Sequence, residues 1–142
     1  MTKEVLVSIV GYQFDVNEEE ATELITMGEY YKKKDKHYIL YEEHLMEDEE
    51  VTKNIMKIGD GKIELVKRGA GNMTMLFEKD RIHTCAYQTP IGELMVGIHT
   101  NQLSIEEKEE EIEACIQYQL KVNGEHISHC EIRIKIQERN QQ

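Results

Sequence analysis

Arg68 is the residue of this sequence with the clearest capacity to hold a ligand. It precedes the turn GAGN, residues 69–72, which we expect to pair Arg68 with Met73 in a hairpin. If the methionine face points inward, Arg68 points inward too, where an unpaired guanidinium is costly. We therefore interpret Arg68 as an anchor for the carboxylate head of an apolar ligand, since a guanidinium binds that group with two hydrogen bonds.

The same pairing also has a purely structural explanation. It sets Glu64 opposite Phe77, so Glu64 would share a face with Arg68 and could form an ion pair with it; alternatively, Arg68 lies at a barrel rim. The ligand hypothesis additionally needs hydroxyl groups and an adaptable apolar wall. The candidates for these roles are Tyr38, Tyr41, Tyr87, Met73, Met75 and Phe77.

His83 and Cys85 form an H-x-C pair on one face of an expected strand. Imidazole and thiolate are soft metal ligands, and a single histidine can hold haem, so His83 is a remote candidate for a metal or haem site. A buried free cysteine beside a hydrogen-bonded histidine explains the pair equally well. No further residues have metal-ligand spacing, and we predict no metal and no cofactor.

No catalytic constellation can be assigned. Glu42 and Glu43 are adjacent, so a strand directs them to opposite faces and they cannot act as a paired acid and base. No Ser-His-Asp or Cys-His arrangement can be assembled from the sequence. We therefore expect no enzymatic activity.

The composition restricts the class of protein and its partners. The 142 residues correspond to one domain, taken as residues 1–142, and 39% of them are hydrophobic, too many for a disordered chain. With 17 basic and 28 acidic residues the net charge is −11, which disfavours nucleic acid and anionic membranes. Three widely spaced cysteines and the lack of a recognisable secretion signal predict a cytoplasmic protein with reduced thiols.

The elements that position these residues are β-strands, and the clearest two form a hairpin near residues 110–122 and 126–138. Both alternate apolar and polar residues, and Asn123-Gly124 lies between them. A plain two-residue turn would set Ile116 opposite Glu131, which mixes apolar and charged residues on one face. Burial determines register more strongly than turn chemistry, so we predict that Ile116 pairs with Ile132 through a bulge within residues 125–128. Cys115 then points outward and Cys130 inward.

A second hairpin is centred on the only proline, Pro90, in the stretch Thr89-Pro90-Ile91-Gly92. Proline at the second position and glycine at the fourth fit a type I turn. The expected pairs are Tyr87 with Leu94, Cys85 with Val96 and His83 with Ile98. Tyr87, Cys85 and His83 would then lie on an inward face.

The same alternation continues along the chain, with short turns and no long amphipathic helix. Expected strands cover residues 3–14, 22–32, 36–44, 50–58, 62–68, 72–79, 81–88, 93–103, 110–122 and 126–138. A capping pattern predicts one short helical turn near residues 104–110. Ten consecutive antiparallel strands favour an all-β up-and-down barrel, because closure removes exposed edges; a two-sheet sandwich is the alternative.

Three stretches resemble one bacterial family. TMGEYYKKKDKHYILYEEH (26–44), KIGDGKIELVKRG (57–69) and YQTPIGELMV (87–96) occur in the order and spacing of the YwiB-like proteins, a family of unknown function. The resemblance covers roughly residues 5–138 and implies a calycin-type, lipocalin-like β-barrel. It supplies no catalytic residues.

These observations predict a cytoplasmic barrel that binds a small apolar or amphipathic molecule. The alternative is a filled barrel that acts as a homodimeric interaction module, because the hairpins leave apolar residues on their expected outer faces. Those residues are Ile63, Leu65, Leu76, Ile82 and Met95.

Overall fold

The structure is a computed structural model that describes residues 3–13, 21–44, 51–69, 72–89 and 92–139. Within these ranges the chain forms ten β-strands. The described residues include no helix long and apolar enough to span a membrane. The strands are β1 (Glu4–Gln13), β2 (Ala21–Lys33), β3 (Lys36–His44), β4 (Val51–Gly59), β5 (Lys62–Arg68), β6 (Met73–Glu78), β7 (Ile82–Thr89), β8 (Gly92–Glu107), β9 (Glu111–Val122) and β10 (Glu125–Glu138).

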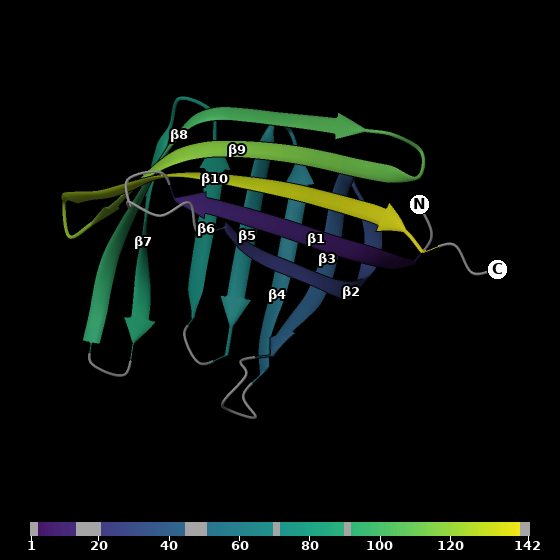
Figure 1. Cartoon of the computed structure of the whole chain (residues 1–142), viewed down its shortest axis with the longest axis horizontal. Helices are drawn as coiled ribbons and strands as arrows, with labels where there is room; N and C mark the ends of the chain where they lie inside the picture. The colour runs from purple at the N-terminus through teal and green to yellow at the C-terminus, as the bar shows by residue number, and fades with distance from the viewer. Residues whose placement is uncertain (1–2, 14–20, 45–50, 70–71, 90–91, 140–142) are drawn as a thin grey trace.

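All ten strands belong to one antiparallel sheet, ordered β6-β5-β4-β3-β2-β1-β10-β9-β8-β7. The first and last strands pair along their length, so the two ends of the chain close the barrel (Figure 1). The ladder is interrupted between β6 and β7, although these strands are consecutive in the chain. The predicted all-β, ten-stranded up-and-down barrel is confirmed in a nearly closed form. The alternative of two separate sheets is wrong, because all ten strands belong to one sheet.

Isolated hydrogen bonds hold the interrupted side together. The Arg81 N–H donates to the Glu78 carbonyl at 3.1 Å in the turn, and the Gln88 N–H reaches the Asn72 carbonyl at 3.5 Å at the far end. The side chain of His83 on β7 bonds Glu78 on β6, with 3.1 Å between Nε2 and Oε1. β7 is therefore tied to β6 at its ends rather than through a continuous ladder.

The predicted register of β9 and β10 is confirmed. Ile116 pairs with Ile132, and the ladder shifts between His126 and Ser128, where Ile127 is the extra residue. Cys130 is buried on the inner face and Cys115 is half-buried on the outer one. Burial of the apolar face thus overrides the two-residue register that Asn123-Gly124 favours.

The hairpin of β7 and β8 also has the predicted pairs. Tyr87 lies opposite Leu94, Cys85 opposite Val96 and His83 opposite Ile98. The proposed type I turn cannot be compared, because residues 90–91 lie outside the described residues.

The predicted register of β5 and β6 is wrong by one residue. Lys67, not Arg68, pairs with Met73, and the ladder continues with Leu65 opposite Met75 and Ile63 opposite Phe77. Ile63 and Leu65 are buried inside the barrel rather than exposed outside it. The longer connection between the strands lets the two apolar faces match, and Arg68 consequently points outward.

The predicted helical turn near residues 104–110 is also wrong. β8 continues as a strand to Glu107 and pairs with β9 from Val96–Val122 to Glu107–Ile112. The alternating half-buried residues Leu103 and Ile105 pack against the core. Pairing and packing of a long strand outweigh a local capping signal.

One end of the barrel is filled by side chains. Seven aliphatic residues there are almost fully buried: Val5, Val7, Ile39, Ile58, Ile98, Ile112 and Ile136. Buried His37 lies on β3 and links this strand to β2 and β8. Its Nδ1 shares a hydrogen bond with the Tyr30 hydroxyl at 2.6 Å, and its Nε2 contacts the Glu107 carboxylate at 2.9 Å.

Candidate functional site

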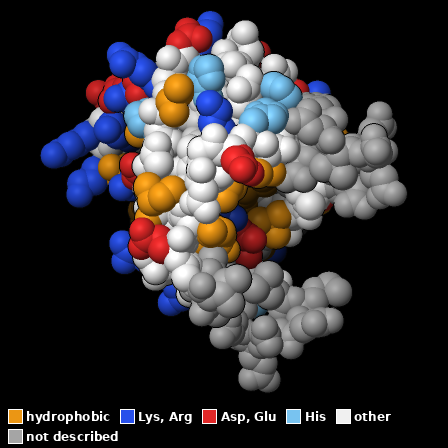
Figure 2. Space-filling view, turned by 90° about the vertical axis from the view of Figure 1, so that its left-hand side faces the viewer, with side chains coloured by type: hydrophobic (Ala, Val, Ile, Leu, Met, Phe, Trp, Pro, Cys, Tyr) orange, Lys and Arg blue, Asp and Glu red, His pale blue; other side chains and the backbone are white. Residues whose placement is uncertain are grey.

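An interior cavity of about 490 Å³ lies toward the other end of the barrel, beyond the filled core. Every strand except β7 and β8 contributes to its lining. The lining residues are Ile9, Gly11, Tyr12, Thr22, Glu23, Leu24, Tyr41, Glu43, Met56, Ile63, Leu65, Lys67, Met75, Phe77, Ile116, Tyr118, Cys130, Glu131, Ile132 and Ile134. Figure 2 shows hydrophobic side chains gathered in the middle of one face of the molecule, with acidic and basic side chains among them.

Most of the cavity wall is apolar, and the deepest part is rigidly packed. Phe77 and Tyr118 meet edge to face with 5.1 Å between ring centroids, a favourable aromatic geometry. Ile116 and Ile134 are buried beside them, whereas Ile132 is half-buried. Burial raises the pKa of the Tyr118 hydroxyl, so this group stays neutral and can hydrogen-bond without carrying charge.

A polar cluster interrupts the apolar wall where β3, β4 and β5 adjoin. The carboxylate oxygen Oε1 of Glu43 accepts from Asn54 Nδ2 at 2.9 Å and from Lys67 Nζ at 3.3 Å. Tyr41 is buried next to them, and its pKa is raised first by burial and then by the charge of Glu43. The second amide atom of Asn54, Oδ1, is buried and has no hydrogen-bond partner among the described residues.

Strand alternation assembles this cluster. His37, Ile39, Tyr41 and Glu43 are successive inward residues of β3, since a strand directs every second side chain to one face. Tyr41 lies opposite Asn54, and Asn54 lies opposite Lys67. Three neighbouring strands therefore place three polar side chains in one inward row.

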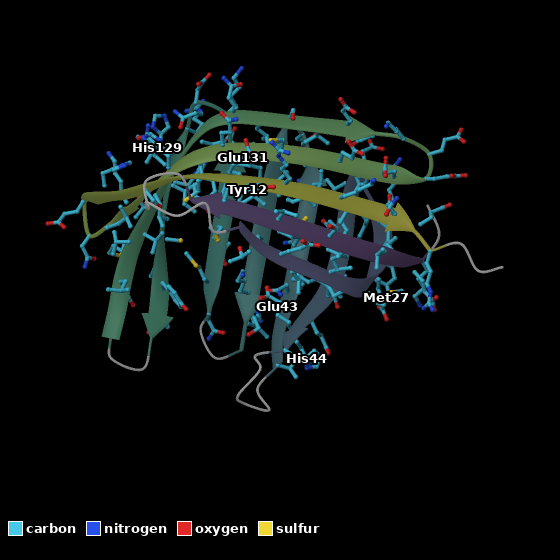
Figure 3. The ribbon with its side chains drawn as sticks, in the orientation of Figure 1. Tyr12, Met27, Glu43, His44, His129 and Glu131 are labelled. Atoms are coloured by element: carbon cyan, nitrogen blue, oxygen red, sulfur yellow. The ribbon has the colours of Figure 1, made fainter. Side chains whose placement is uncertain are left out.

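A buried carboxylate lies where β1 and β10 pair. Glu131 is 6% exposed although the alternation places it on the outer face, opposite Tyr12 (Figure 3). Its side chain accepts from Arg133 Nε at 2.8 Å and from Gln117 Nε2 at 3.0 Å. Arg133 balances the buried charge of Glu131, and Gln117 supplies a second hydrogen bond to it.

The predicted site residues separate into two groups. Tyr41, Met75 and Phe77 do line the interior cavity, and Met73 is half-buried at the end of the Tyr41–Asn54–Lys67 row. The structure does not bring the others to it. Arg68 and Tyr38 face outward, and Tyr38 lies under Lys57, with 5.9 Å between the ammonium nitrogen and the ring centroid.

Tyr87 and His83 lie on β7, which does not contribute to the cavity. Tyr87 is 36% exposed, as is its partner Leu94, and His83 is engaged with Glu78. That hydrogen bond is the main cause that lowers the pKa of Glu78. In the described part of the chain, no three histidine, cysteine or acidic residues are grouped so that they could hold a metal ion.

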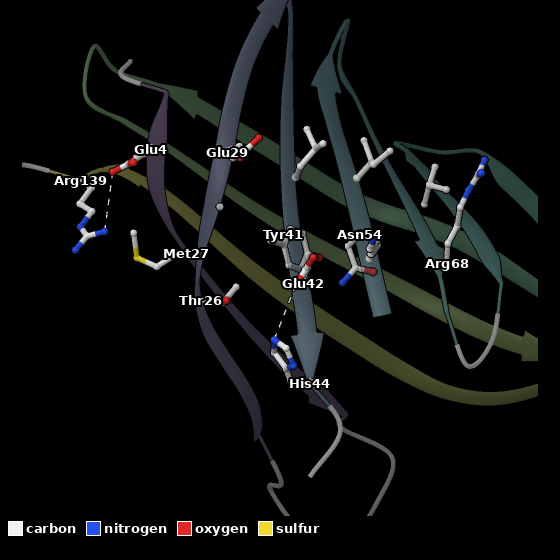
Figure 4. Close-up of a pocket in the computed structure, with 15 residues that line it drawn as sticks. Glu4, Thr26, Met27, Glu29, Tyr41, Glu42, His44, Asn54, Arg68 and Arg139 are labelled. Carbon is white, nitrogen blue, oxygen red and sulfur yellow. Dashed lines mark ion pairs between the residues drawn. The ribbon is translucent and has the colours of Figure 1, made fainter. Parts of the chain in front are cut away.

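Arg68 belongs instead to a shallow groove of about 800 Å³ on the outer face of β2–β5 (Figure 4). The floor of this groove is a cross-strand row of Leu40, Ile55 and Val66. Charged residues flank that row. They are Glu4, Glu29, Glu42, Lys53, Arg68 and Arg139.

Sequence reasoning missed Glu43, Asn54 and Lys67. Two features of the sequence could have identified them. The first is that Ile63 and Leu65 match the inward residues of β6 only if Lys67, rather than Arg68, is the next inward residue of β5. The second is the alternation that excluded a paired acid and base at residues 42–43, because it also sends one of these two glutamates inside.

The comparisons with known proteins agree with this geometry. A family model described as "Domain of unknown function (DUF1934)" matches residues 7–134. The "Uncharacterized beta-barrel protein YwiB" of Bacillus subtilis is 30% identical over 112 residues, which cover 78% of this chain and 77% of that protein. A crystal structure of the B. subtilis ywiB protein superposes with a TM-score of 0.83 at 22% identity, covering 97% of this chain and 93% of that one, and thus supports the fold. The chain belongs to the DUF1934 family of YwiB-like β-barrel proteins.

Proposed function

We propose that this protein binds a small amphipathic molecule inside the barrel. The observation that carries the proposal is the interior cavity itself, which is apolar along most of its wall and carries the ion pair of Glu43 and Lys67 beside Tyr41. Its volume of about 490 Å³ falls in the usual range for ligand sites, about 300–1,000 Å³.

In this proposal the two parts of the cavity have different roles. The apolar body of the ligand packs against Met75, Phe77 and Ile116, and its burial supplies most of the affinity. The polar end contacts Tyr41 and the Glu43 cluster, which orients it. The proposed role is binding without catalysis. It agrees with the calycin-like resemblance, since the barrel is packed at one end and has a cavity toward the other.

Native mass spectrometry of gently purified protein, combined with an absorption spectrum, tests this function. We expect an adduct of small-molecule mass that is lost on denaturation. A neutral solvatochromic dye should also bind the emptied protein and shift its emission to the blue, as dyes do in apolar sites. A bare protein that also leaves the dye unshifted would refute the binding role, and a haem absorption band would point to His83 instead.

A homodimer through the outer groove is the second candidate function. Met27 on β2 also lines the groove and is 43% exposed, and Ile25, two residues earlier on the same face of β2, is 58% exposed. The groove also combines acidic and basic residues, so a second copy related by a twofold axis can set opposite charges against one another. Light scattering after size exclusion should then give twice the monomer mass for the wild type and a single mass for Ile55→Glu.

A further inference from the structure

The ion pair inside the cavity has a consequence for the kind of ligand that the cavity accepts. Lys67 is the sole basic residue among the described lining residues, and it is already paired with Glu43. We infer that the ligand has a neutral, hydrogen-bonding head, such as a hydroxyl or a primary amide, rather than a carboxylate or an ammonium group. This inference rests on the proposed function.

The charges of Glu43 and Lys67 neutralise each other, so neither is available to pair with a charged ligand head. A carboxylate head would have to compete with Glu43 for Lys67 and would lie close to the Glu43 charge. An ammonium head would compete with Lys67 for the same carboxylate. The side chains of Glu43 and Lys67 are only 27% and 33% exposed, so solvent screens these repulsions weakly.

The rest of the lining strengthens the selection against an anion. Glu23 and Glu131 also belong to it, and Glu131 is already balanced by Arg133 at 2.8 Å, outside the lining. No second lysine, and no arginine, lines the cavity within the described residues. A free fatty acid would therefore find no unpaired basic group among these described lining residues.

The neutral hydroxyl of Tyr41, beside the ion pair, also fits a neutral head. Asn54 is 1% exposed and is not a lining residue of the cavity, so it acts by holding Glu43 at 2.9 Å rather than by contacting the ligand. Tyr41 is 4% exposed and remains a neutral hydroxyl. A hydroxyl or amide head can donate one hydrogen bond and accept another, so it can pair with the Tyr41 hydroxyl in either role.

Competition for a bound neutral dye tests the inference in the wild-type protein. Three competitors with the same alkyl chain are compared at about pH 7, where the acid and the amine are both charged: an alkanol, an alkanoate and an alkylammonium. The alkanol should displace the dye at the lowest concentration. An alkanoate or alkylammonium that competes better than the alkanol would overturn the inference.

Two variants should reverse the preference by releasing one charge each. Glu43→Gln keeps the side-chain shape and frees Lys67, so the alkanoate should gain about tenfold or more relative to the alkanol, as expected for a new charge-assisted hydrogen bond. Lys67→Met frees Glu43, so the alkylammonium should gain instead. Glu42→Gln and Arg68→Met are matched controls, because these sequence neighbours lie on the outer face and should change nothing.

The outcomes distinguish failure of the proposed binding function from failure of the inference that the ligand head is neutral. If neither the dye nor any competitor binds the wild type, the proposed binding function fails. If the dye binds but Glu43→Gln leaves the ranking unchanged, binding stands and the neutral-head inference fails. Should Lys67→Met not fold, as judged by circular dichroism, the isosteric Glu43→Gln variant still decides between these results.

Discussion

Lys67 and Arg68 are adjacent in the chain, yet the barrel wall separates their side chains. Lys67 lies inside with Glu43, and Arg68 lies in the outer groove with Lys53. Which of the two cations faces inward goes with the register of β5 against β6, and that register follows from matching Ile63 with Phe77. The alternating pattern predicts that one of these two cations faces inward. The turn at residues 69–72 alone led to the prediction of Arg68, whereas the structure has Lys67 there.

Asn54 should contribute to stability because its buried amide holds the half-buried carboxylate of Glu43. Asn54→Ala removes a donor to Glu43 and should lower the free energy of unfolding by about 1–3 kcal/mol, the cost of leaving a buried polar group with fewer partners. Lys53→Ala, on the outer face of the same strand, should change it by less than about 0.5 kcal/mol. Urea denaturation of both variants measures the difference, and equal effects would contradict the role assigned to Asn54.

The filled end of the barrel offers a second pair of neighbouring residues. Tyr30→Phe removes the hydroxyl that bonds His37, and we expect a loss of about 1–2 kcal/mol because a buried ring nitrogen loses its partner. Tyr31→Phe removes an exposed bond to Glu29 and should cost less than about 0.5 kcal/mol. Thermal denaturation that ranks the two variants in the opposite order would refute this account.

At the scale of elements, burial predicts strand pairing where the apolar pattern is long. The twelve residues of β9 specify their register against β10 so strongly that a bulge was predictable. The six residues of β6 carry a shorter pattern, and there the register prediction failed. The capping signal at Ser104 failed for a related reason: it is local, whereas the pairing of β8 with β9 involves the whole strand.

The bulge in β10 leads to a prediction about single-residue deletions. Deleting Ile127 should be tolerated, because the ladder then becomes continuous while Ile116 still faces Ile132. Deleting Arg133, also exposed, should unfold the protein, because it moves Ile134 and Ile136 to the outer face. The cost would approach the whole stability of a small domain, about 5–15 kcal/mol.

Circular dichroism and urea titration compare these two deletions directly. A folded Arg133 deletion of wild-type stability would show that the register is not determined by burial.

The tie between β6 and β7 should give the stability of the protein a pH dependence. Bonding to His83, with a smaller contribution from Lys62, lowers the pKa of Glu78 in the folded state. A lowered pKa stabilises the fold above the unfolded value, about 4.3, and this contribution disappears as the pH falls through the folded value. The stability advantage of the wild type over Glu78→Gln should therefore shrink in acid.

Urea titrations at neutral and acidic pH check this dependence. The matched control is Glu109→Gln, in the exposed turn before β9, which should follow the wild type at both pH values. A wild-type advantage over Glu78→Gln that grows in acid would contradict the assignment.

At the scale of the whole molecule, the barrel was predictable and its interior was not. Ten alternating strands and short turns predict a barrel; β1 pairs with β10, and the ladder remains interrupted between β6 and β7. The alternation tells which side chains face inward, but it does not tell whether they fill the space between them. Near Val5 and Ile136 they do, whereas around Met75 and Ile132 a cavity of about 490 Å³ remains.

The central claim, that this cavity is a binding site, is tested most directly by titrating a neutral solvatochromic dye into two tryptophan variants. Ile132→Trp places a larger side chain in the cavity, and Ile25→Trp adds the same side chain to the exposed outer face. We predict that Ile132→Trp weakens dye binding by about tenfold or more while Ile25→Trp leaves it within about twofold of the wild type. Equal dye affinity in both folded variants, or loss of binding in Ile25→Trp alone, would contradict the claim.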